Sequence, residues 1–313
     1  MGLSLLVAAV AVLGALVGSY PVGWAGLSSW VAGRADPTVG QILGDVRVPR
    51  VAATLLCGGT LGLAGPLLQG TFRTPLADSY LLGLAGLGAL FAVTFQGMGL
   101  AGFGAPVLAS FGSLIAVWLV NVLTRDDSAE RRALVGVALA AVSLAGLSMA
   151  LALGSSVGGA GVVGWVVGDF YAHSWPQVRA MLPLGVPAVL LALFSGRVLN
   201  LLQLGDDVAG NLGLNPRAAR TGLSVLAAVL TGVAVGTAGL LGFVGLLAAG
   251  AARGVMGTDN RRLLPAAFLF GAAAVGLSDL LGRVLLAPNE LPAGAFTTIL
   301  GGIYLVKLAR SAA

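Results

Sequence analysis

Long apolar runs, separated only by short polar clusters, constrain this chain more than any other feature. Leu3–Val17, Leu182–Phe194 and Leu223–Leu247 are such runs, and only 9% of the 313 residues are charged. A water-soluble domain of this size needs far more charge to cover its surface. A bilayer-spanning helix needs about 20 mostly apolar residues, because lipid satisfies no backbone hydrogen bond. The composition therefore predicts an all-α, polytopic membrane protein.

Cutting the chain at its polar clusters predicts about ten transmembrane helices. They lie near residues 2–20, 48–69, 79–97, 103–123, 133–153, 178–197, 221–240, 241–256, 263–282 and 293–309. The seventh and eighth meet at Gly239–Gly242 without a polar loop. Because these segments take up nearly all of the chain, we expect one transmembrane domain over residues 1–313 and no soluble catalytic module.

The distribution of basic residues predicts the orientation, since Lys and Arg in short loops are retained in the cytoplasm. Twelve of the seventeen Lys and Arg residues fall in alternate connections or after the last span, and five fall on the other side. Both termini are therefore expected to be cytoplasmic. The net charge of +5 follows from this topology, so we expect contact with the lipid bilayer and none with nucleic acid.

The sequence lacks the motifs of nucleotide-binding and metal-binding proteins. No G-x-x-x-x-G-K-[ST] sequence occurs, and the sole lysine, Lys307, is followed by Leu308. The chain is therefore not expected to bind ATP by itself. It has one histidine, and its one cysteine, Cys57, lies inside an apolar run. We predict no catalytic residue, no metal site and no cofactor.

Ionisable residues at mid-membrane depth are a feature of proton-coupled carriers, and this chain has few of them. Asp279 is the one acidic residue placed well inside a predicted span, and Arg283 follows it on the same helical face. This spacing predicts a local ion pair near the outer end of the helix rather than a proton relay. A transport path with so few titratable groups must take its energy from elsewhere.

An enzyme inside the bilayer would need polar side chains that converge, and Asp169, Tyr171 and His173 are close in sequence. They fall at the predicted outer interface beside Trp165 and Trp175, where aromatic belts are common. We therefore interpret this cluster as part of an interfacial belt rather than as an active site.

The polar connection over about residues 203–220 has the pattern of an ordered element. The Gly-Asp-Asp sequence at 205–207 predicts a short helix with carboxylates at its positive end, and Gly213 suits the position after that helix. Asn215 and Pro216 predict the start of a second short helix. Two such helices across the cytoplasmic face could dock a partner. An ordered loop that only joins two spans fits the pattern equally well.

Several short motifs follow one another in a fixed order along the chain. They are Arg47–Arg50 (RVPR), Gly58–Gly65 (GGTLGLAG), Thr74–Ala77 (TPLA), Leu204–Arg220, Gly242–Leu246 (GFVGL), Gly257–Arg262 (GTDNRR) and Glu290–Gly294 (ELPAG). In this order and spacing they resemble the FecCD-type permease subunits of bacterial ABC importers for iron-siderophores, haem and vitamin B12. The resemblance covers the chain from about residue 40 to the end. Thr74 stands where that family has Asn, and Ala249-Gly250 stands where it has Pro-His.

The resemblance implies the permease fold of type II ABC importers, with helices from two permease subunits around one translocation path. The second permease subunit would be either another copy or a different chain. Two cytoplasmic ATPase subunits and an extracytoplasmic substrate-binding protein would complete the importer in the bacterial cytoplasmic (inner) membrane. The permease itself would not be an enzyme. Ferric siderophore is the expected cargo, with haem and vitamin B12 as alternatives.

The resemblance also implies roles for individual residues. The arginines expected to receive acidic residues of the binding protein are Arg47, Arg50 and Arg283, although snorkelling to the interface would also explain the first two. The loop expected to contact the ATPase contains Leu204, Gly205, Asp206, Asp207, Gly213, Asn215, Arg217 and Arg220. The cytoplasmic gate is expected at Thr74, Pro75 and Leu76, together with Ser143 and Ser148. For the two serines, a hydroxyl bonded to its own helix is an equally good interpretation.

Two other classes of function stay open at this point. A secondary transporter driven by an ion gradient would accumulate solute without an ATPase, and the scarcity of buried acids argues against it. A membrane-embedded enzyme or scaffold subunit would need the convergent polar groups that the sequence does not indicate.

Overall fold

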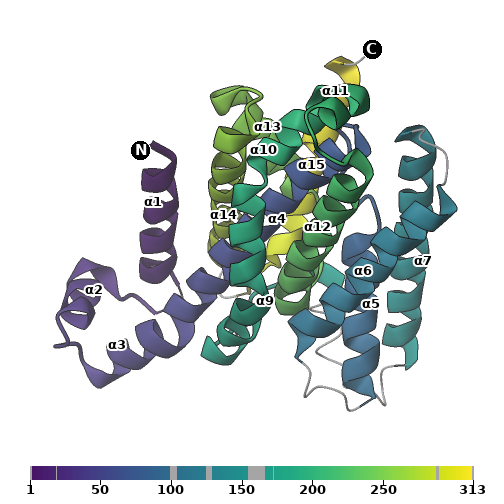
Figure 1. Ribbon diagram of the computed structural model, residues 1–313. Helices are drawn as coiled ribbons and strands as arrows, with labels where there is room; N and C mark the ends of the chain where they lie inside the picture. The colour runs from purple at the N-terminus through teal and green to yellow at the C-terminus, as the bar shows by residue number, and fades with distance from the viewer. Residues whose placement is uncertain are drawn as a thin grey trace.

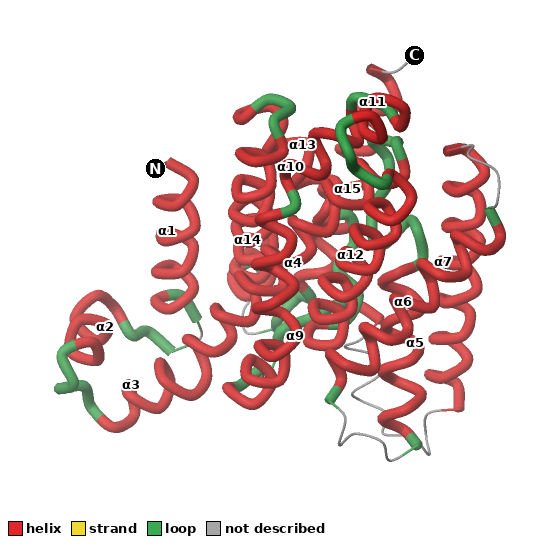
Figure 2. Tube along the Cα trace, in the orientation of Figure 1, coloured by secondary structure: helices red, strands yellow, loops and turns green. Residues whose placement is uncertain are grey.

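The computed structural model describes residues 2–18, 20–98, 104–124, 129–153, 166–171, 173–286 and 289–311. These residues form helices and contain no strand (Figures 1 and 2). The helices are α1 (Gly2–Leu16), α2 (Gly23–Val31), α3 (Pro37–Gln41), the π-helical η1 (Ile42–Arg47), α4 (Val48–Phe72), α5 (Leu84–Gly97), α6 (Ala105–Leu123), α7 (Ala129–Leu153), α9 (Trp175–Phe194), α10 (Gly196–Gln203), α11 (Asp206–Asn211), α12 (Pro216–Ala238), α13 (Val244–Met256), α14 (Asn260–Val284) and α15 (Ala293–Ser311).

The helices confirm the prediction of an all-α, multi-pass membrane protein. Six helical segments of the described chain are long and apolar enough to cross a bilayer, and the longest is Pro37–Phe72 with 36 residues. Four shorter apolar helices lie at Gly2–Leu16, Leu84–Phe95, Val244–Met256 and Ala293–Leu308. Every segment predicted from the sequence coincides with one of these helices. The number of membrane crossings stays a prediction, because the four shorter helices fall below the length of an ordinary span.

Helices α4 and α14 form the centre of the bundle and pack with their backbones in contact. A Cβ atom built at Gly58 or at Gly62 would overlap the carbonyl oxygen of Gly271 or of Ala267, respectively. Small residues permit such an approach, which replaces the hydrophobic driving force that is missing between helices in lipid. Of the apolar stretch within Pro37–Phe72, 83% is buried, against 17% of the stretch within α7. Helix α4 is therefore a core element and α7 a peripheral one.

The chain ends and α11 share one end of the bundle. In Figure 1 the N-terminal end of α1 and the C-terminal end of α15 both point toward the end that carries α11. The start of α4, by contrast, follows α3 at the opposite end (Figure 1). We use "α11 end" and "opposite end" for these two sides. The shared direction of the termini agrees with an even number of crossings.

Residues 21–47, expected to be a connection, form helical elements that project from the bundle (Figure 1). The side chain of Asp36 accepts a hydrogen bond from Thr38 N at 2.9 Å, and Pro37 occupies the first turn of α3. Both features start a helix locally. These elements lack the long apolar periodicity on which the prediction of spans depends, so that prediction missed them.

Two irregular segments interrupt the bundle and appear as loops in Figure 2. One runs from Arg73 to Gly83, so that α5 begins at Leu84 rather than near residue 79. The other joins α12 to α13 at Gly239–Phe243, as predicted. Non-helical backbone is tolerated at membrane depth only where protein buries it or where it lines a water-filled cavity. The second segment and the inner part of the first meet the first condition, because residues 77–79 and 239–243 are buried, whereas residues 73, 75 and 76 are exposed at the α11 end.

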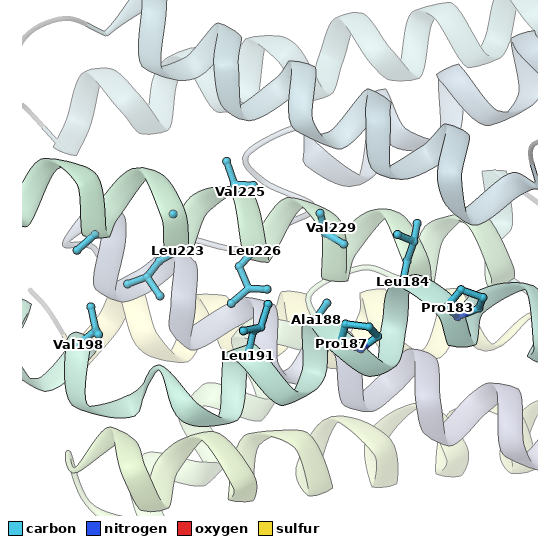
Figure 3. A pocket seen from close by; sticks show the side chains of 12 residues that line it. Pro183, Leu184, Pro187, Ala188, Leu191, Val198, Leu223, Val225, Leu226 and Val229 are labelled. Carbon is cyan, nitrogen blue, oxygen red and sulfur yellow. The ribbon is translucent and has the colours of Figure 1, made fainter.

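A groove of about 630 Å³ lies between α9 and α12, and every residue that lines it is apolar or glycine. Figure 3 shows Leu191 of α9 and Leu226 of α12 pointing toward each other across this groove. No group among its lining residues could hold a polar cargo, so the groove suits contact with lipid better than a transport path.

Candidate functional site

Arg50, at the start of α4, is held by two carboxylates at the opposite end of the bundle. Its Nε and Nη2 donate to Oδ1 of Asp279 at 3.0 and 2.8 Å, and its Nη1 donates to Oε2 of Glu290 at 2.7 Å. Arg50 and Asp279 are buried, whereas the Glu290 side chain keeps 27% of its surface. Glu290 is therefore the member of this group that solvent reaches most easily.

Arg283 completes this cluster, and the predicted Asp279–Arg283 ion pair is confirmed. Nη2 of Arg283 lies 2.9 Å from Oδ2 of Asp279, one helical turn away. Its Nη1 donates to the carbonyl oxygen of Gly14 at 3.0 Å, at the end of α1. We call Arg50, Asp279, Arg283 and Glu290 the arginine–carboxylate cluster. It joins α4 and α14 to each other and to α1.

Arg47 also faces inward. Its Nη1 donates to the carbonyl oxygens of Ala15 and Leu16 at 2.9 and 2.7 Å, and its Nη2 donates to that of Tyr20. These include the last carbonyls of α1, which have no partner within the helix and carry partial negative charge. All three arginines expected to dock a binding protein are thus buried and engaged inside the chain. Apart from the Asp279–Arg283 pair, the sequence did not indicate these internal partners, which lie 27 or more residues away.

The segment Thr74–Leu76, predicted as a gate, is a turn at the α11 end that follows directly on α4. Pro75 and Leu76 are exposed, and Thr74 is partly buried. Nε2 of Gln69 donates to the carbonyl oxygen of Pro75 at 3.0 Å, and Arg253 of α13 donates to Oε1 of the same Gln69. The turn is therefore tied to α13 through one glutamine side chain.

Asp78, one residue before the predicted span at 79–97, holds the other end of this segment and is buried. Its carboxylate accepts hydrogen bonds from the backbone N–H of Tyr80 at 2.8 Å and of Leu246 at 3.0 Å. Leu246 lies in the first turn of α13, where free N–H groups and the helix dipole stabilise an anion. The neighbouring Ser79 hydroxyl pairs with that of Thr231 in α12 at 2.7 Å. These two contacts fix the irregular segment to α12 and α13.

The two serines predicted for the gate bond to their own helix, α7. Ser143 Oγ donates to the carbonyl oxygen of Leu139 at 2.6 Å, and Ser148 Oγ donates to that of Leu144 at 2.9 Å. Ser143 is buried against Gly86 of α5, whereas Ser148 is exposed. The structure therefore gives these hydroxyls the local bonding that the sequence left open as an alternative.

In the loop at about 203–220, the first short helix forms as predicted, but the second short helix does not. Gly205 precedes α11 with a φ of 100°, and Gly213 follows it with a φ of 83°, both in the region that favours glycine. Asn215 accepts a hydrogen bond from Ala218 N at 3.1 Å, as expected of a cap. The second helix is not a separate short one, however, because α12 runs without a break from Pro216 to Ala238. Leu204, Asp207 and Arg217 are exposed.

Asp206 is the point where this loop meets the gate turn. Its Oδ1 lies 2.6 Å from Nη2 of Arg73, the residue that follows α4, and 2.6 Å from Nη2 of Arg220 in α12. A polar cavity of about 800 Å³ lies beside these pairs. It is lined by Pro66, Gln69, Gly70, Arg73, Thr74, Pro75, Leu202, Gln203, Gly205, Asp206, Asp207, Arg253 and Asn260. The predicted loop and the predicted gate turn therefore border one space.

A hydrogen-bonded connection between α10 and the start of α14 lies beside this cavity, which Asn260 lines. Asn200 donates to Oδ1 of Asp259 at 2.7 Å and accepts from the backbone N–H of Asn260 at 2.9 Å. The hydrogen bond from Asn200, with a further one from the backbone of Arg261, lowers the pKa of Asp259 below its usual value. The carboxylate thus stays charged as the cap of α14.

The aromatic cluster near His173 has structural partners. Nε2 of His173 lies 2.8 Å from the carbonyl oxygen of Thr237, and Nε1 of Trp175 donates to the carbonyl oxygen of Gly44 at 2.8 Å. Trp165 lies outside the described residues. Within the described part of the chain, no group of three or more His, Cys, Asp or Glu residues could hold a metal ion.

Comparison with known proteins agrees with these features over nearly the whole chain. Residues 5–311 match the FecCD transport family. The hemin transport system permease protein HmuU of Yersinia pestis is 34% identical over 84% of this chain and 81% of its own length. The Fe(3+) dicitrate transport system permease protein FecD of Escherichia coli is 34% identical over 98% and 96%. The vitamin B12 import system permease protein BtuC of Salmonella paratyphi A is 35% identical over 100% and 95%.

Solved structures share the fold. A transporter assigned to the metal-chelate type of ABC transporters, solved in an inward-facing conformation, superposes with a TM-score of 0.84 at 25% identity. The match covers 99% of this chain and 98% of that one. PsaBC from Streptococcus pneumoniae, solved with a Fab, has a TM-score of 0.60 at 12% identity over 90% and 94%, which speaks for the fold alone. The ordered motifs, the helical architecture and the full-length matches lead to one conclusion: this chain belongs to the FecCD transport family.

Proposed function

We propose that this chain is the permease subunit of a binding-protein-dependent ABC importer whose cargo is a ferric siderophore. The observation that carries the proposal is the match to FecCD permeases along the whole chain. Two of the relatives named above transport iron in a chelated form, as hemin or as ferric dicitrate. Haem and vitamin B12 are the alternative cargoes, because relatives for both have nearly the same identity to this chain.

In the proposed mechanism the cargo passes between two permease subunits while separate ATPase subunits supply the energy. Such alternating access needs two packings of the helices whose balance depends on the nucleotide state of the partners. The permease need not bind cargo tightly, and tight binding would slow its release. The two buried acids of the described residues, Asp78 and Asp279, are held by structural partners rather than left for a proton relay, which supports a path of this passive kind.

The second permease subunit is proposed to face α7. This helix packs mainly on α5 and exposes apolar side chains along its length, with Leu134 at 71%, Val142 at 65% and Met149 at 64% exposure. Pairing of two such faces would place the exposed Ser148 of α7 on the side that faces the second subunit. We propose about ten crossings for each subunit with both termini in the cytoplasm. The α11 end then meets the ATPase subunits through residues 203–220.

Reconstitution with the partner subunits tests the function. The chain would be purified with its ATPase and a second permease subunit, placed in liposomes, and supplied with binding protein loaded in turn with ferric siderophore, haem or cobalamin. We expect ferric siderophore to stimulate ATP hydrolysis and to be taken up, with uptake unaffected by an uncoupler. ATP hydrolysis that is stimulated only by haem or only by cobalamin would identify that molecule as the cargo in place of ferric siderophore. Uphill uptake by the chain without an ATPase would contradict the permease proposal itself.

Docking of the binding protein is proposed to occur at the arginine–carboxylate cluster, with Glu290 as an internal competitor. Glu290 holds Nη1 of Arg50 and is the most exposed member of the cluster. An acidic residue of the binding protein would replace it. We expect Glu290→Gln to strengthen binding of the binding protein by about two- to fivefold, the value of one partly exposed ion pair.

Binding of the binding protein to the reconstituted importer, measured by biolayer interferometry at several salt concentrations, tests this expectation. Arg34→Gln is the control, because Arg34 is exposed and belongs to none of the motifs. The gain of affinity should shrink as salt increases. A loss of affinity in Glu290→Gln would contradict the competition and would indicate that Glu290 itself contributes to docking.

A further inference from the structure

Asp206 lies where the loop proposed to contact the ATPase meets the gate turn. It is the first residue of α11, in the loop proposed to contact the ATPase. One of its carboxylate oxygens, Oδ1, accepts from Arg73 and from Arg220, both at 2.6 Å. Arg73 is the last residue before the gate turn, and Arg220 lies near the start of α12. A single oxygen atom therefore joins α11, the gate turn and α12.

The backbone at Arg73 has an uncommon conformation. Its φ of 54° and ψ of 34° lie in the left-handed region, which a residue with a Cβ seldom adopts. Such a conformation is strained and persists only where the surroundings determine it. Here the ion pair with Asp206 holds the side chain, and Pro75 follows two residues later. The gate turn thus begins at a strained residue whose side chain is attached to the loop.

The far end of the gate segment is fixed to the interior. The Asp78 carboxylate accepts from the first turn of α13, and the Ser79 hydroxyl pairs with that of Thr231. The cavity beside the turn leaves space into which the turn can move. A shift of α11 would therefore act on Arg73 while residues 78 and 79 stay anchored to α12 and α13. The residues between these two points would change their conformation.

The exposure of the ion pair argues that stability is not its main role. The side chains of Arg73 and Asp206 keep 46% and 40% of their surface. Exposed pairs of this kind contribute little to the free energy of folding. The Arg220 side chain is less exposed, at 13%, so the test uses Asp206→Asn, which keeps an oxygen for Arg220 and should leave the subunit folded.

We propose that Asp206 is a positioning residue that transmits movement of the ATPase-facing loop to the gate turn through Arg73. The proposal rests on the proposed function and names the residues that would couple the ATPase-facing loop to the gate turn. When the ATPase subunits change state, α11 moves, Asp206 displaces Arg73, and the turn at Thr74–Leu76 opens or closes. Arg220 shares the same oxygen and keeps Asp206 oriented while α11 moves.

The test uses the complete importer in liposomes and measures uptake and ATP hydrolysis in the same sample. In Asp206→Asn we expect hydrolysis to continue while uptake per ATP falls roughly 5- to 10-fold, the lower range of measured coupling effects. Asp206→Glu should restore most of the uptake per ATP hydrolysed. Arg73→Gly should reproduce the loss, because glycine accepts the left-handed backbone but removes the guanidinium. The double variant should be no worse than either single one.

Asp45→Asn is the control, since Asp45 is an exposed acid on η1 that no motif includes. Its uptake per ATP should equal that of the unchanged chain. An unchanged ratio in Asp206→Asn and in Arg73→Gly would overturn the proposal and leave the proposed function intact. Absence of ATP-dependent uptake by the unchanged importer would overturn both. If Asp206→Asn fails to assemble, Asp206 has a structural role and the proposal is likewise overturned.

Discussion

Asp279→Ala is expected to lower the free energy of unfolding more than the loss of any other charged side chain named above. Asp279 is buried, and its two oxygens face Arg50 and Arg283, which are buried as well. Removal of the carboxylate leaves two guanidinium groups inside the protein with less opposite charge. Breaking a buried ion pair in this way costs about 3–5 kcal/mol. The melting temperature in detergent should fall by roughly 10 °C.

Thermal unfolding followed by intrinsic fluorescence checks this prediction. Asp45→Ala is the matched control, because Asp45 is exposed and its loss should change stability by about 0.5 kcal/mol or less. Faster proteolysis should accompany the loss of stability. Arg283 also holds the end of α1 through the carbonyl oxygen of Gly14, so a protease should cut the α1–α2 region faster in Asp279→Ala. Equal melting temperatures for the two variants would contradict the structural role of the cluster.

Gly271→Ala is expected to have the second large effect, through a single added methyl group. A Cβ atom at Gly271 would overlap the carbonyl oxygen of Gly58 in α4. Backbone atoms cannot rotate away as a flexible side chain can, so α4 and α14 must move apart. Overpacking of this kind typically costs about 1–3 kcal/mol. The larger Gly271→Leu should prevent the two helices from packing and should abolish recovery of folded protein.

Gly254→Ala provides the control for this substitution. Gly254 lies in α13, and a Cβ atom there would meet no other atom within 4 Å. We expect its melting temperature to stay the same or to rise slightly, because alanine is the better helix former. A similar loss of stability in both alanine variants would point to a general need for glycine rather than to contact between α4 and α14.

The features that were predictable from the sequence are those decided by neighbouring residues. The apolar runs place the helices, because lipid leaves a backbone few alternatives. Gly205 and Gly213 fix the ends of α11 through their positive φ, and Asn215 caps α12 with its own side chain. The Asp279–Arg283 pair follows from helical spacing. In each case the determining contact lies within a few residues.

The features that were missed depend on residues distant in the chain. Arg50 meets Asp279 across 229 positions, and Arg47 meets the end of α1 across about 30. Asp78 is an acid beside a polar turn, and only the fold brings the start of α13 to it. A pattern along the chain carries no information on such pairings. One departure from the family motif has a visible explanation, since the hydroxyl of Tyr304 fills the space beside Gly250 where a larger side chain would clash.

The uneven burial of the helices has an evolutionary consequence. Side chains on the exposed face of α7 take little part in internal packing, so their replacement should cost little stability. The α4–α14 contact, by contrast, tolerates almost no change. Under the proposed assembly, a lineage could therefore adapt to a new chelate by altering α7 without destabilising the fold of the subunit itself. Such modular divergence would allow one scaffold to serve chemically unrelated nutrients.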